Sequence, residues 1–301
     1  MNPERAGRSI AIVSMGLSAL LATAKIVVGL KANSTAVVSD GLESTGDLLA
    51  SGLVFFGLLA ASKPPDEKHP YGHGRIEALS ALVVGMMLVA SGALISFRSL
   101  ERASEGQHAP AGYAIFPLIA SITIKGVLSF TKRRYGRKIG SAALTADAWN
   151  DGVDILSGIT ALAAVGITLS DPVRLASADH LGGAAVGVIV IIVGFRVVRD
   201  TALQLMDTMP DPDSLDQIRR VASSVPGALG VEKCYARKTG LKWHVDLHLE
   251  VDPQMSVYES HEIATRVREK VRHDIDWVAD VLVHVEPHLP ATITDRAHGK
   301  S

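Results

Sequence analysis

Residues 39–52 read SDGLESTGDLLASG, a largely apolar stretch that nevertheless carries Asp40, Glu43 and Asp47. In an α-helix, residues four positions apart lie on one face, so Glu43 and Asp47 point the same way. An ionisable group at bilayer depth costs at least about 2.5 kcal/mol on insertion scales and usually marks an ion pathway or a proton relay. The stretch therefore predicts a membrane helix with a polar site inside it.

The same arrangement occurs a second time in residues 146–158, which read ADAWNDGVDILSG. Here Asn150 and Asp154 share a helical face. Oxygen-bearing side chains from two helices can converge as a tetrahedral shell around a divalent cation. The alternative is that these groups lie near the lipid headgroups or make structural hydrogen bonds, but two spaced sets in separate apolar segments favour a cation site. Its four predicted ligands are Glu43, Asp47, Asn150 and Asp154.

Three more acids accompany the predicted ligands. Asp40 and Asp147 lie about one turn earlier on each helix, and Asp151 is expected to face partly away from the ligand face. We interpret all three as residues that support the site or line the path to it.

The composition indicates a chain that is part membrane protein and part soluble. Of its 301 residues, 48% are hydrophobic, and the mean hydropathy is +0.25. A hydrocarbon core of about 30 Å requires roughly 20 apolar residues per helix. Because the first apolar run continues past a cleavage-like sequence and five more follow, we interpret it as a membrane helix and not a signal peptide. The six predicted spans are 9–30, 34–61, 76–100, 112–131, 141–169 and 180–204.

The positions of the basic residues predict the orientation in the membrane. Lys and Arg gather in the N-terminal segment, in the loop after the second span and in the predicted loop after the fourth, which reads KRRYGRK (132–138). An excess of Lys and Arg belongs on the cytoplasmic side. We therefore predict an integral protein of the cytoplasmic (inner) membrane with both termini in the cytoplasm.

The C-terminal part has the pattern of a soluble α/β domain. Residues 242–251 (KWHVDLHLEV) and 278–287 (VADVLVHVEP) alternate apolar and polar positions, as half-buried strands do. A helix follows Ser256, which stands in capping-box register with Glu259. With a further helix from about 213 and a strand near 229–237, the predicted order is αββαβ. The predicted domains are 1–208, a six-helix transmembrane domain, 209–290, a cytoplasmic domain, and 291–301, a disordered tail.

Four motifs together resemble the cation diffusion facilitator family. SDGLESTGD and ADAWNDGVD are similar to its second-span and fifth-span signatures, and DEKHPYGHGRIEAL (66–79) and LMDTMPD (205–211) to two more. The motifs occur in the family's order and cover nearly the whole chain. The resemblance implies a ferredoxin-like (metallochaperone-like) cytoplasmic domain and a homodimer in the lipid bilayer. It also implies export of divalent transition metals from the cytoplasm, commonly in exchange for protons, and no enzymatic activity.

The chain departs from the zinc-selective members of that family, which usually carry His-x-x-x-Asp in both helices. Glu43 and Asn150 stand at the two imidazole positions. Imidazole suits Zn²⁺, whereas carboxylate and carbonyl oxygens suit harder ions, so the change favours Mn²⁺ or Fe²⁺, although Zn²⁺ also accepts carboxylates. Without histidine in the site, exchanged protons must be carried by carboxylates, which crowd together and titrate as a coupled set.

The resemblance also implies two cytoplasmic metal sites. In the loop after the second span, Asp66, His69 and His73 offer one oxygen and two imidazole nitrogens; the alternative is a Pro/Gly turn with solvated histidines. In the C-terminal domain, a spacing of two places histidines of two strands on one sheet surface, which is otherwise only a polar face. The predicted ligands there are Glu232, His248, His261, His284 and Glu286.

The family also pairs a basic and an acidic residue at the cytoplasmic ends of its third and sixth spans. Arg75 and Asp207 occupy these places, and the resemblance implies that they hold the third spans of two protomers in register. The alternative is that both are solvated interface residues.

Several other functions are excluded or open. The net charge of −1 gives no reason to expect nucleic acid, and the absence of a GxxxxGK[ST] loop argues against a nucleotide-driven pump. The metalloprotease motif HExxH fails because Thr265 stands where the second histidine is needed. A membrane metal-binding or assembly protein of the same fold that does not transport remains the alternative to a transporter.

Overall fold

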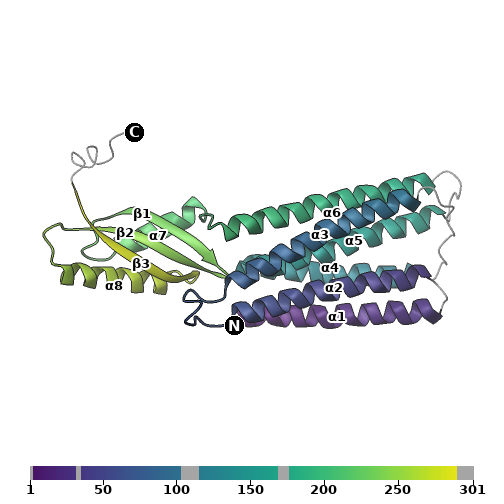
Figure 1. Cartoon of the computed structure of the whole chain (residues 1–301), viewed down its shortest axis with the longest axis horizontal. Coiled ribbons are helices and arrows are strands. Elements are labelled where there is room, and N and C mark those ends of the chain that lie inside the picture. Colours follow the sequence, from purple (N-terminus) through teal and green to yellow (C-terminus); the bar gives the residue numbers. More distant parts are fainter. Residues whose placement is uncertain (1–2, 32–34, 103–114, 169–175, 290–301) are drawn as a thin grey trace. The chain divides into compact units, whose positions relative to one another are not determined.

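The computed structural model describes residues 3–31, 35–102, 115–168 and 176–289 (Figure 1). Within these ranges, side chains are described except at 3–5, 28–31, 35–43, 46, 102, 115, 117–118, 161–168 and 176–183. The predicted tail, residues 291–301, lies outside them. The chain divides into two compact units, residues 1–202 and 203–301.

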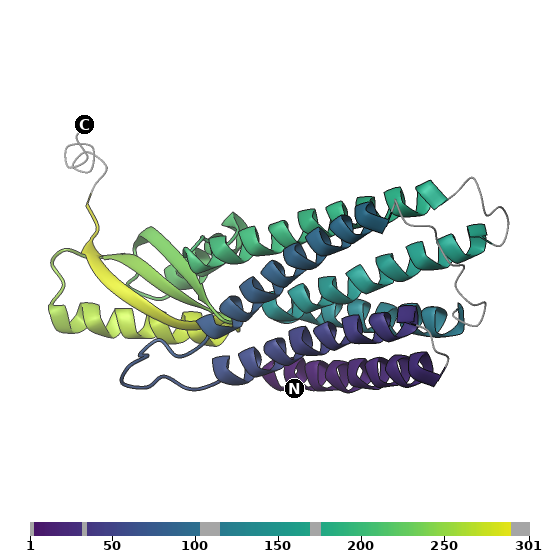
Figure 2. The ribbon, with the colours of Figure 1, turned by 45° about the vertical axis from the view of Figure 1, so that its right-hand side comes forward.

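In its described residues, the first unit is built from six long helices. Figures 1 and 2 show these helices side by side. Among the described residues, the segments Ala6–Val27 and Arg75–Glu101 are long and apolar enough to cross a membrane, and Asp47–Ala61 is a shorter apolar segment. The helices are α1 (Pro3–Lys31), α2 (Thr35–Ala61), α3 (Arg75–Arg102), α4 (Ile115–Ile139), α5 (Ala142–Thr168) and α6 (Ala176–Leu205).

The fourth helix corrects one sequence prediction. KRRYGRK, predicted as a cytoplasmic loop, is helical, and α4 continues to Ile139. Lysine and arginine have high helix propensity, so a basic run after an apolar one does not end a helix. The helix ends instead at Gly140, whose φ of 70° is the left-handed conformation that glycine adopts at helix C-termini.

Helices α2, α4 and α5 form the part of the bundle that carries the predicted ligands. Contacts join α4 to α5, α2 to α5, and α1 to both α2 and α4. The beginning of α5 is fixed by Glu77 of α3, which is fully buried. Glu77 Oε1 accepts hydrogen bonds from Ser141 Oγ (2.7 Å) and from the backbone N–H of Ala143 (2.8 Å). A carboxylate at a helix N-terminus stabilises it, so Glu77 helps to hold α5 in place.

Glycines allow α3 and α6 to approach closely. A Cβ atom added at Gly92 would lie 2.7 Å from the carbonyl oxygen of Gly187, and one at Gly194 would lie 2.8 Å from the backbone nitrogen of Val89. No side chain fits at either position. Gly85 of α3 also faces α6, where its neighbours are Val197 and Val198.

The second unit confirms the predicted αββαβ order. Strand β2 pairs antiparallel with β1 and parallel with β3, which gives the sheet order β1-β2-β3. Both helices pack on one face of the sheet, since α7 contacts β1, α8 contacts β3, and the helices contact each other. The elements are α7 (Pro212–Ser223), β1 (Gly230–Thr239), β2 (Lys242–Val251), α8 (Val257–Asp274) and β3 (Val278–Pro287).

The core of this unit follows the alternation of the strands. Val245, Leu247 and Leu249 of β2 are buried against α8, whose Val267 is fully buried. The capping box predicted at the start of α8 is present, because Ser256 and Glu259 bond to each other's backbone N–H groups. The even-numbered residues of β2, including His248, therefore lie on the face opposite the helices.

Candidate metal centre

The structure brings α2 and α5 together at Asp47 and Asn150. Asn150 Nδ2 donates a hydrogen bond to Asp47 Oδ1 over 2.9 Å, and both residues are buried. Asp154 lies one turn further along α5, and its side chain is 20% exposed. Three of the four predicted ligands thus lie close together. Glu43, the fourth, and Asp40 belong to α2, but their side chains lie outside the described residues.

A buried lysine of α4 lies between these acids. Lys125 Nζ is 3.1 Å from Asp47 Oδ2, 3.0 Å from Asp151 Oδ1 and 2.8 Å from Asp154 Oδ2. The Lys125 side chain is only 1% exposed, so three carboxylates surround its ammonium group out of contact with water. Buried charges need such partners, since an unpaired ion in the interior is costly.

A second lysine extends the cluster two turns further along α4. Lys132 Nζ lies 2.8 Å from Asp147 Oδ2 and 2.6 Å from Asp151 Oδ2. Ser51 of α2 donates to Asp147 Oδ1 over 3.0 Å. All these groups are buried, and Asp151 links the two lysines because each of its oxygens contacts one of them.

These contacts change the interpretation of Asp151 and add two buried lysines to the candidate site. Asp151, expected to face partly away, is 1% exposed and shares Lys125 with Asp47 and Asp154. The sequence-based expectation took into account only the side of α5 that faces α2. The structure shows that α4 also packs against α5, so Asp151 is buried against the lysines of α4. Sequence reasoning missed both lysines. Lys125 interrupts the fourth apolar segment, and a charge at that depth is itself a sign of a functional site.

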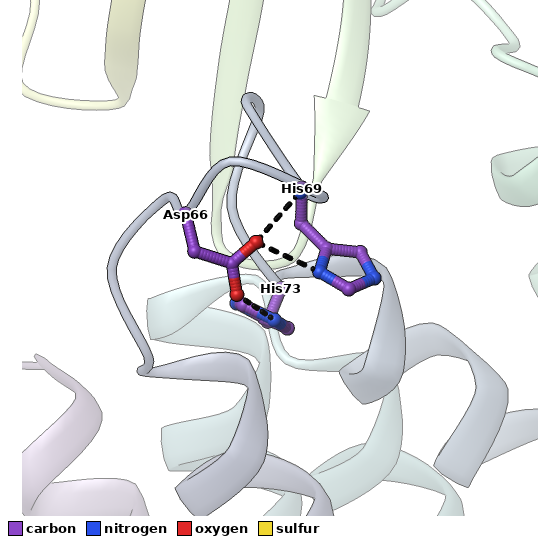
Figure 3. A group of neighbouring side chains, drawn as sticks. All are labelled: Asp66, His69 and His73. Atoms are coloured by element: carbon purple, nitrogen blue, oxygen red, sulfur yellow. Dashed lines mark hydrogen bonds and ion pairs between the residues drawn. The ribbon is translucent and has the colours of Figure 1, made fainter.

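The loop after α2 brings together the three residues predicted there (Figure 3). Asp66 Oδ1 lies 3.0 Å from His69 Nδ1, and Asp66 Oδ2 lies 3.3 Å from His73 Nε2. One ligand atom from each of the three lies within 4.8 Å of the others. The backbone N–H of His69 donates to Asp66 over 2.7 Å, which holds the pKa of Asp66 below its ordinary value. The trio has the donors and the spacing of a three-ligand metal site.

A second group forms on the open face of the sheet in the cytoplasmic domain. His248 and His284 are register partners on β2 and β3, and Glu286 lies two residues further along β3. His248 Nδ1 lies 2.5 Å from Glu286 Oε1, and one ligand atom from each of the three lies within 4.8 Å of the others. Hydrogen bonding with Glu232, and then with His248, lowers the pKa of Glu286. Glu232 therefore lies next to Glu286, and its role as a ligand stays a prediction.

His261 does not join the group within one chain. It is exposed on α8, and α8 packs against the apolar face of the sheet, on the opposite side from His248. The sequence suggested a neighbouring helix without showing which sheet face that helix covers. Within one chain, His261 therefore cannot share a metal ion with His248 and His284.

Arg75 and Asp207 belong to different compact units. Arg75 begins α3, and Asp207 follows α6 with a φ of 59°. Their proposed pairing stays a prediction.

Comparison with known families decides what kind of protein carries these sites. Residues 11–206 match the family model of the cation efflux transmembrane domain, and residues 210–288 match that of the cation efflux protein cytoplasmic domain. The chain belongs to the cation efflux, or cation diffusion facilitator, family. Proteins of this family are integral membrane cation efflux proteins and not enzymes, and the match to the cytoplasmic domain model indicates dimerisation.

Its relatives are spread over plants and bacteria. This cation efflux protein is 31% identical to metal tolerance protein C1 of Arabidopsis thaliana, over 95% of this chain and 63% of that protein. It is 27% identical to manganese efflux system protein MneP of Bacillus subtilis (strain 168), over 95% and 98% of the two chains. It is 30% identical to magnetosome protein MamB of Magnetospira, over 88% and 90%. The chain thus spans less than two thirds of the plant relative and most of the two bacterial ones.

Among solved structures, a cadmium form of a variant MamM CTD is 28% identical to this cation efflux protein. The match covers 26% of this chain and 98% of that one, with a TM-score of 0.26.

Proposed function

We propose that this chain exports divalent transition-metal cations from the cytoplasm in exchange for protons. The observation that carries the proposal is the buried hydrogen bond between Asn150 of α5 and Asp47 of α2, which lies beside Asp154, so that three of the four proposed ligands are close together. Glu43, one turn before Asp47 on α2, completes the proposed set.

The chemistry of these donors favours Mn²⁺ and Fe²⁺ while admitting Zn²⁺. Carboxylate and amide oxygens give little of the soft-donor advantage that imidazole and thiolate give zinc. Against this, the Irving–Williams order places Zn²⁺ above Mn²⁺ in affinity at most sites. We therefore propose broad selectivity that includes Mn²⁺ or Fe²⁺. One relative, MneP, is named a manganese efflux protein, which supports the same choice.

Protons are the proposed counter-ions because the ligands are carboxylates. Closely spaced carboxylates in a low dielectric hold protons and metal ions in competition and titrate as a coupled set. Metal binding from the cytoplasm then releases protons, and protonation on the other side releases the metal. Asp40, Asp147 and Asp151 support this exchange or line the path to it.

The alternative function is a membrane metal-binding or assembly protein that does not transport. One observation favours it, because the ammonium group of Lys125 occupies the space between Asp47 and Asp154 where a metal ion would bind. A relative with another kind of name, magnetosome protein MamB, shows that sequences of this type are not all named as transporters.

Flux through purified protein in liposomes separates the two functions. Mn²⁺, Fe²⁺, Zn²⁺, Co²⁺ and Cd²⁺ are offered in turn, with and without an opposing pH gradient. We expect Mn²⁺ or Fe²⁺ flux that the gradient accelerates. Absence of flux for all five ions, in protein that still binds Mn²⁺, would establish the alternative.

We further propose an inner-membrane homodimer whose cytoplasmic domain regulates transport. Labelling of an introduced cysteine provides a simple test of orientation, because Cys234 is the single cysteine of the chain and is buried. Burial raises its pKa to about 11, so little reactive thiolate forms at neutral pH. A Tyr258→Cys variant adds an exposed thiol on α8. We expect labelling only after the membrane is permeabilised; labelling of intact cells would place the domain outside.

A further inference from the structure

The position of Lys125 raises a question that metal transport alone does not answer. Its ammonium group lies 3.1 Å from Asp47 and 2.8 Å from Asp154, the two carboxylates of the proposed metal site that the structure describes. A transition-metal ion binds carboxylate oxygens at about 2.0–2.2 Å and carries two positive charges. A metal ion and this ammonium group cannot hold the same oxygens at once, because like charges at such a distance repel strongly in a buried site.

We propose that Lys125 is a tethered counter-cation of the transport site, which a divalent ion displaces when it binds and which returns when the ion leaves. The proposal rests on the proposed function and identifies a residue that sets the metal affinity of that site. The lysine supplies positive charge to Asp47 and Asp154 while no metal is bound, so the empty site does not leave two carboxylates unpaired in the interior.

The cluster also provides a place for the displaced ammonium group. Asp151 Oδ1 already accepts from Lys125 at 3.0 Å, and Asp151 lies on the same helix as Asp154, three residues earlier. The long lysine side chain can leave two carboxylates and keep the third. Lys132 is held separately by Asp147 and Asp151, and it does not contact Asp47 or Asp154.

The described groups of the cluster carry an excess of negative charge. Four carboxylates, if all are ionised, and two ammonium groups leave a formal charge of −2, and the carboxylate of Glu43 in the proposed set adds a further negative charge. A bound cation would reduce this excess while both lysines stay in the cluster. The four carboxylates are Asp47, Asp147, Asp151 and Asp154, and the two lysines are Lys125 and Lys132.

The sign of an affinity change tests the proposal. A lysine that only holds the helices together would weaken metal binding when removed, whereas a competing cation would strengthen it. The experiment measures Mn²⁺ binding by full-length protein in detergent, using calorimetry. All variants carry His69→Ala, His248→Ala and His284→Ala, so that the cytoplasmic sites do not contribute.

We expect Lys125→Met to bind Mn²⁺ at least about tenfold more tightly, an ordinary size for coupling between two mutually exclusive ligands. Lys125→Arg keeps the charge and should remain near the parent affinity. Lys132→Met is the matched control, since it removes the same charge from the same helix without uncovering Asp47 or Asp154, and it should give a smaller gain. An unchanged or weaker affinity in Lys125→Met would overturn the proposal.

Two further variants keep the test decisive. If Lys125→Met does not fold, Lys125→Met with Asp151→Asn removes one charge of each sign, and the same gain in affinity is expected there. Asp154→Ala in the parent background should abolish Mn²⁺ binding. If Asp154→Ala binds normally, the transport site has been misplaced and the proposal on Lys125 fails with it. If Asp154→Ala abolishes binding but the lysine variants bind no more tightly, only the role of Lys125 is refuted.

Discussion

Asn150 Nδ2 donates a hydrogen bond to Asp47 Oδ1 over 2.9 Å and thereby joins α5 to α2. The two residues are 103 positions apart in the sequence, and each belongs to a pair with i, i+4 spacing. Their contact places Asp47 and Asn150 on facing surfaces of these adjacent helices. A divalent ion bound between these helices would contact side chains of both α2 and α5. Replacing these side chains one by one therefore tests what each contributes to metal binding and selectivity.

The first prediction concerns the carboxylates themselves. Asp47→Ala and Asp154→Ala should each reduce Mn²⁺ flux in proteoliposomes at least about a hundredfold, because each leaves the ion with too few anionic ligands. Asp200→Ala, which removes a 71% exposed carboxylate of α6, is the control and should transport normally. Near-normal flux in either buried variant, with normal amounts of protein in the membrane, would move the site elsewhere, for example to Asp147 and Asp151.

The second prediction concerns metal selectivity. Glu43→His with Asn150→His introduces two imidazole ligands, which suit zinc better than manganese, so the ratio of Mn²⁺ to Zn²⁺ flux should fall about tenfold or more. The two fluxes are measured in the same proteoliposomes before and after the change. A parent protein that transports Zn²⁺ and rejects Mn²⁺ would show that these two positions do not set the selectivity.

The third prediction concerns the open face of the cytoplasmic sheet. His248→Ala with His284→Ala removes two of the three convergent ligands, so the full-length protein should lose one class of Mn²⁺ or Zn²⁺ binding sites. The activation of transport by metal on the cytoplasmic side should also become weaker. His273→Ala, at a side chain that is 88% exposed, is the control. Unchanged binding stoichiometry in the double variant would mean that these histidines are not ligands.

The fourth prediction concerns the pH dependence of the cytoplasmic domain. Arg268 donates two hydrogen bonds of 2.8 Å to the carboxylate of Asp280. Partial burial opposes ionisation of Asp280. The hydrogen bonds from Arg268 and from the backbone N–H of Val281, together with the charges of Arg268 and Arg272, outweigh this effect and lower the pKa of Asp280 below its ordinary value of 3.8. The stabilisation is therefore complete above that ordinary value and is lost as the pH falls through the lower, folded-state pKa.

Hydrogen exchange of β3 in the full-length protein measures this contribution. At pH 7, Arg268→Met should lower the free energy of opening by about 0.5 kcal/mol, the usual size for an exposed ion pair. The difference from the parent should shrink once the pH is lowered below the pKa of Asp280. Arg266→Met, at an exposed position of the same helix, should show no such pH dependence. A difference that is the same at both pH values would refute the ionic origin.

The fifth prediction tests Arg75 and Asp207 as an interlocking pair. Asp207→Asn removes the charge and keeps a residue type that tolerates the positive φ of 59° at this position. Arg75→Gln removes the other charge. If the two residues interact, either change should weaken the dimer in detergent, and the double variant should weaken it little further. Fully additive effects would indicate two independent solvated residues.

Local sequence patterns predicted the cytoplasmic domain almost completely. The alternation in β2 and β3 and the Ser256–Glu259 capping box depend on neighbours within a few residues, so the order αββαβ, the buried face and the placement of His248 and His284 on one sheet surface could be predicted. His261 could not be placed in the same way. Its distance from the other histidines depends on the sheet face that α8 covers, which no local pattern specifies.

In the membrane part, the sequence by itself determined that two apolar helices carry polar residues at i, i+4, because helical periodicity follows from the backbone alone. Only the tertiary structure decided that Lys125 and Lys132 lie against these acids. Their partners belong to α2 and α5, and which helices become neighbours depends on packing over the whole bundle. A lysine in an apolar segment indicates that an acidic partner is buried beside it. Which acid this is depends on which helices pack against the lysine and not on its neighbours in the sequence.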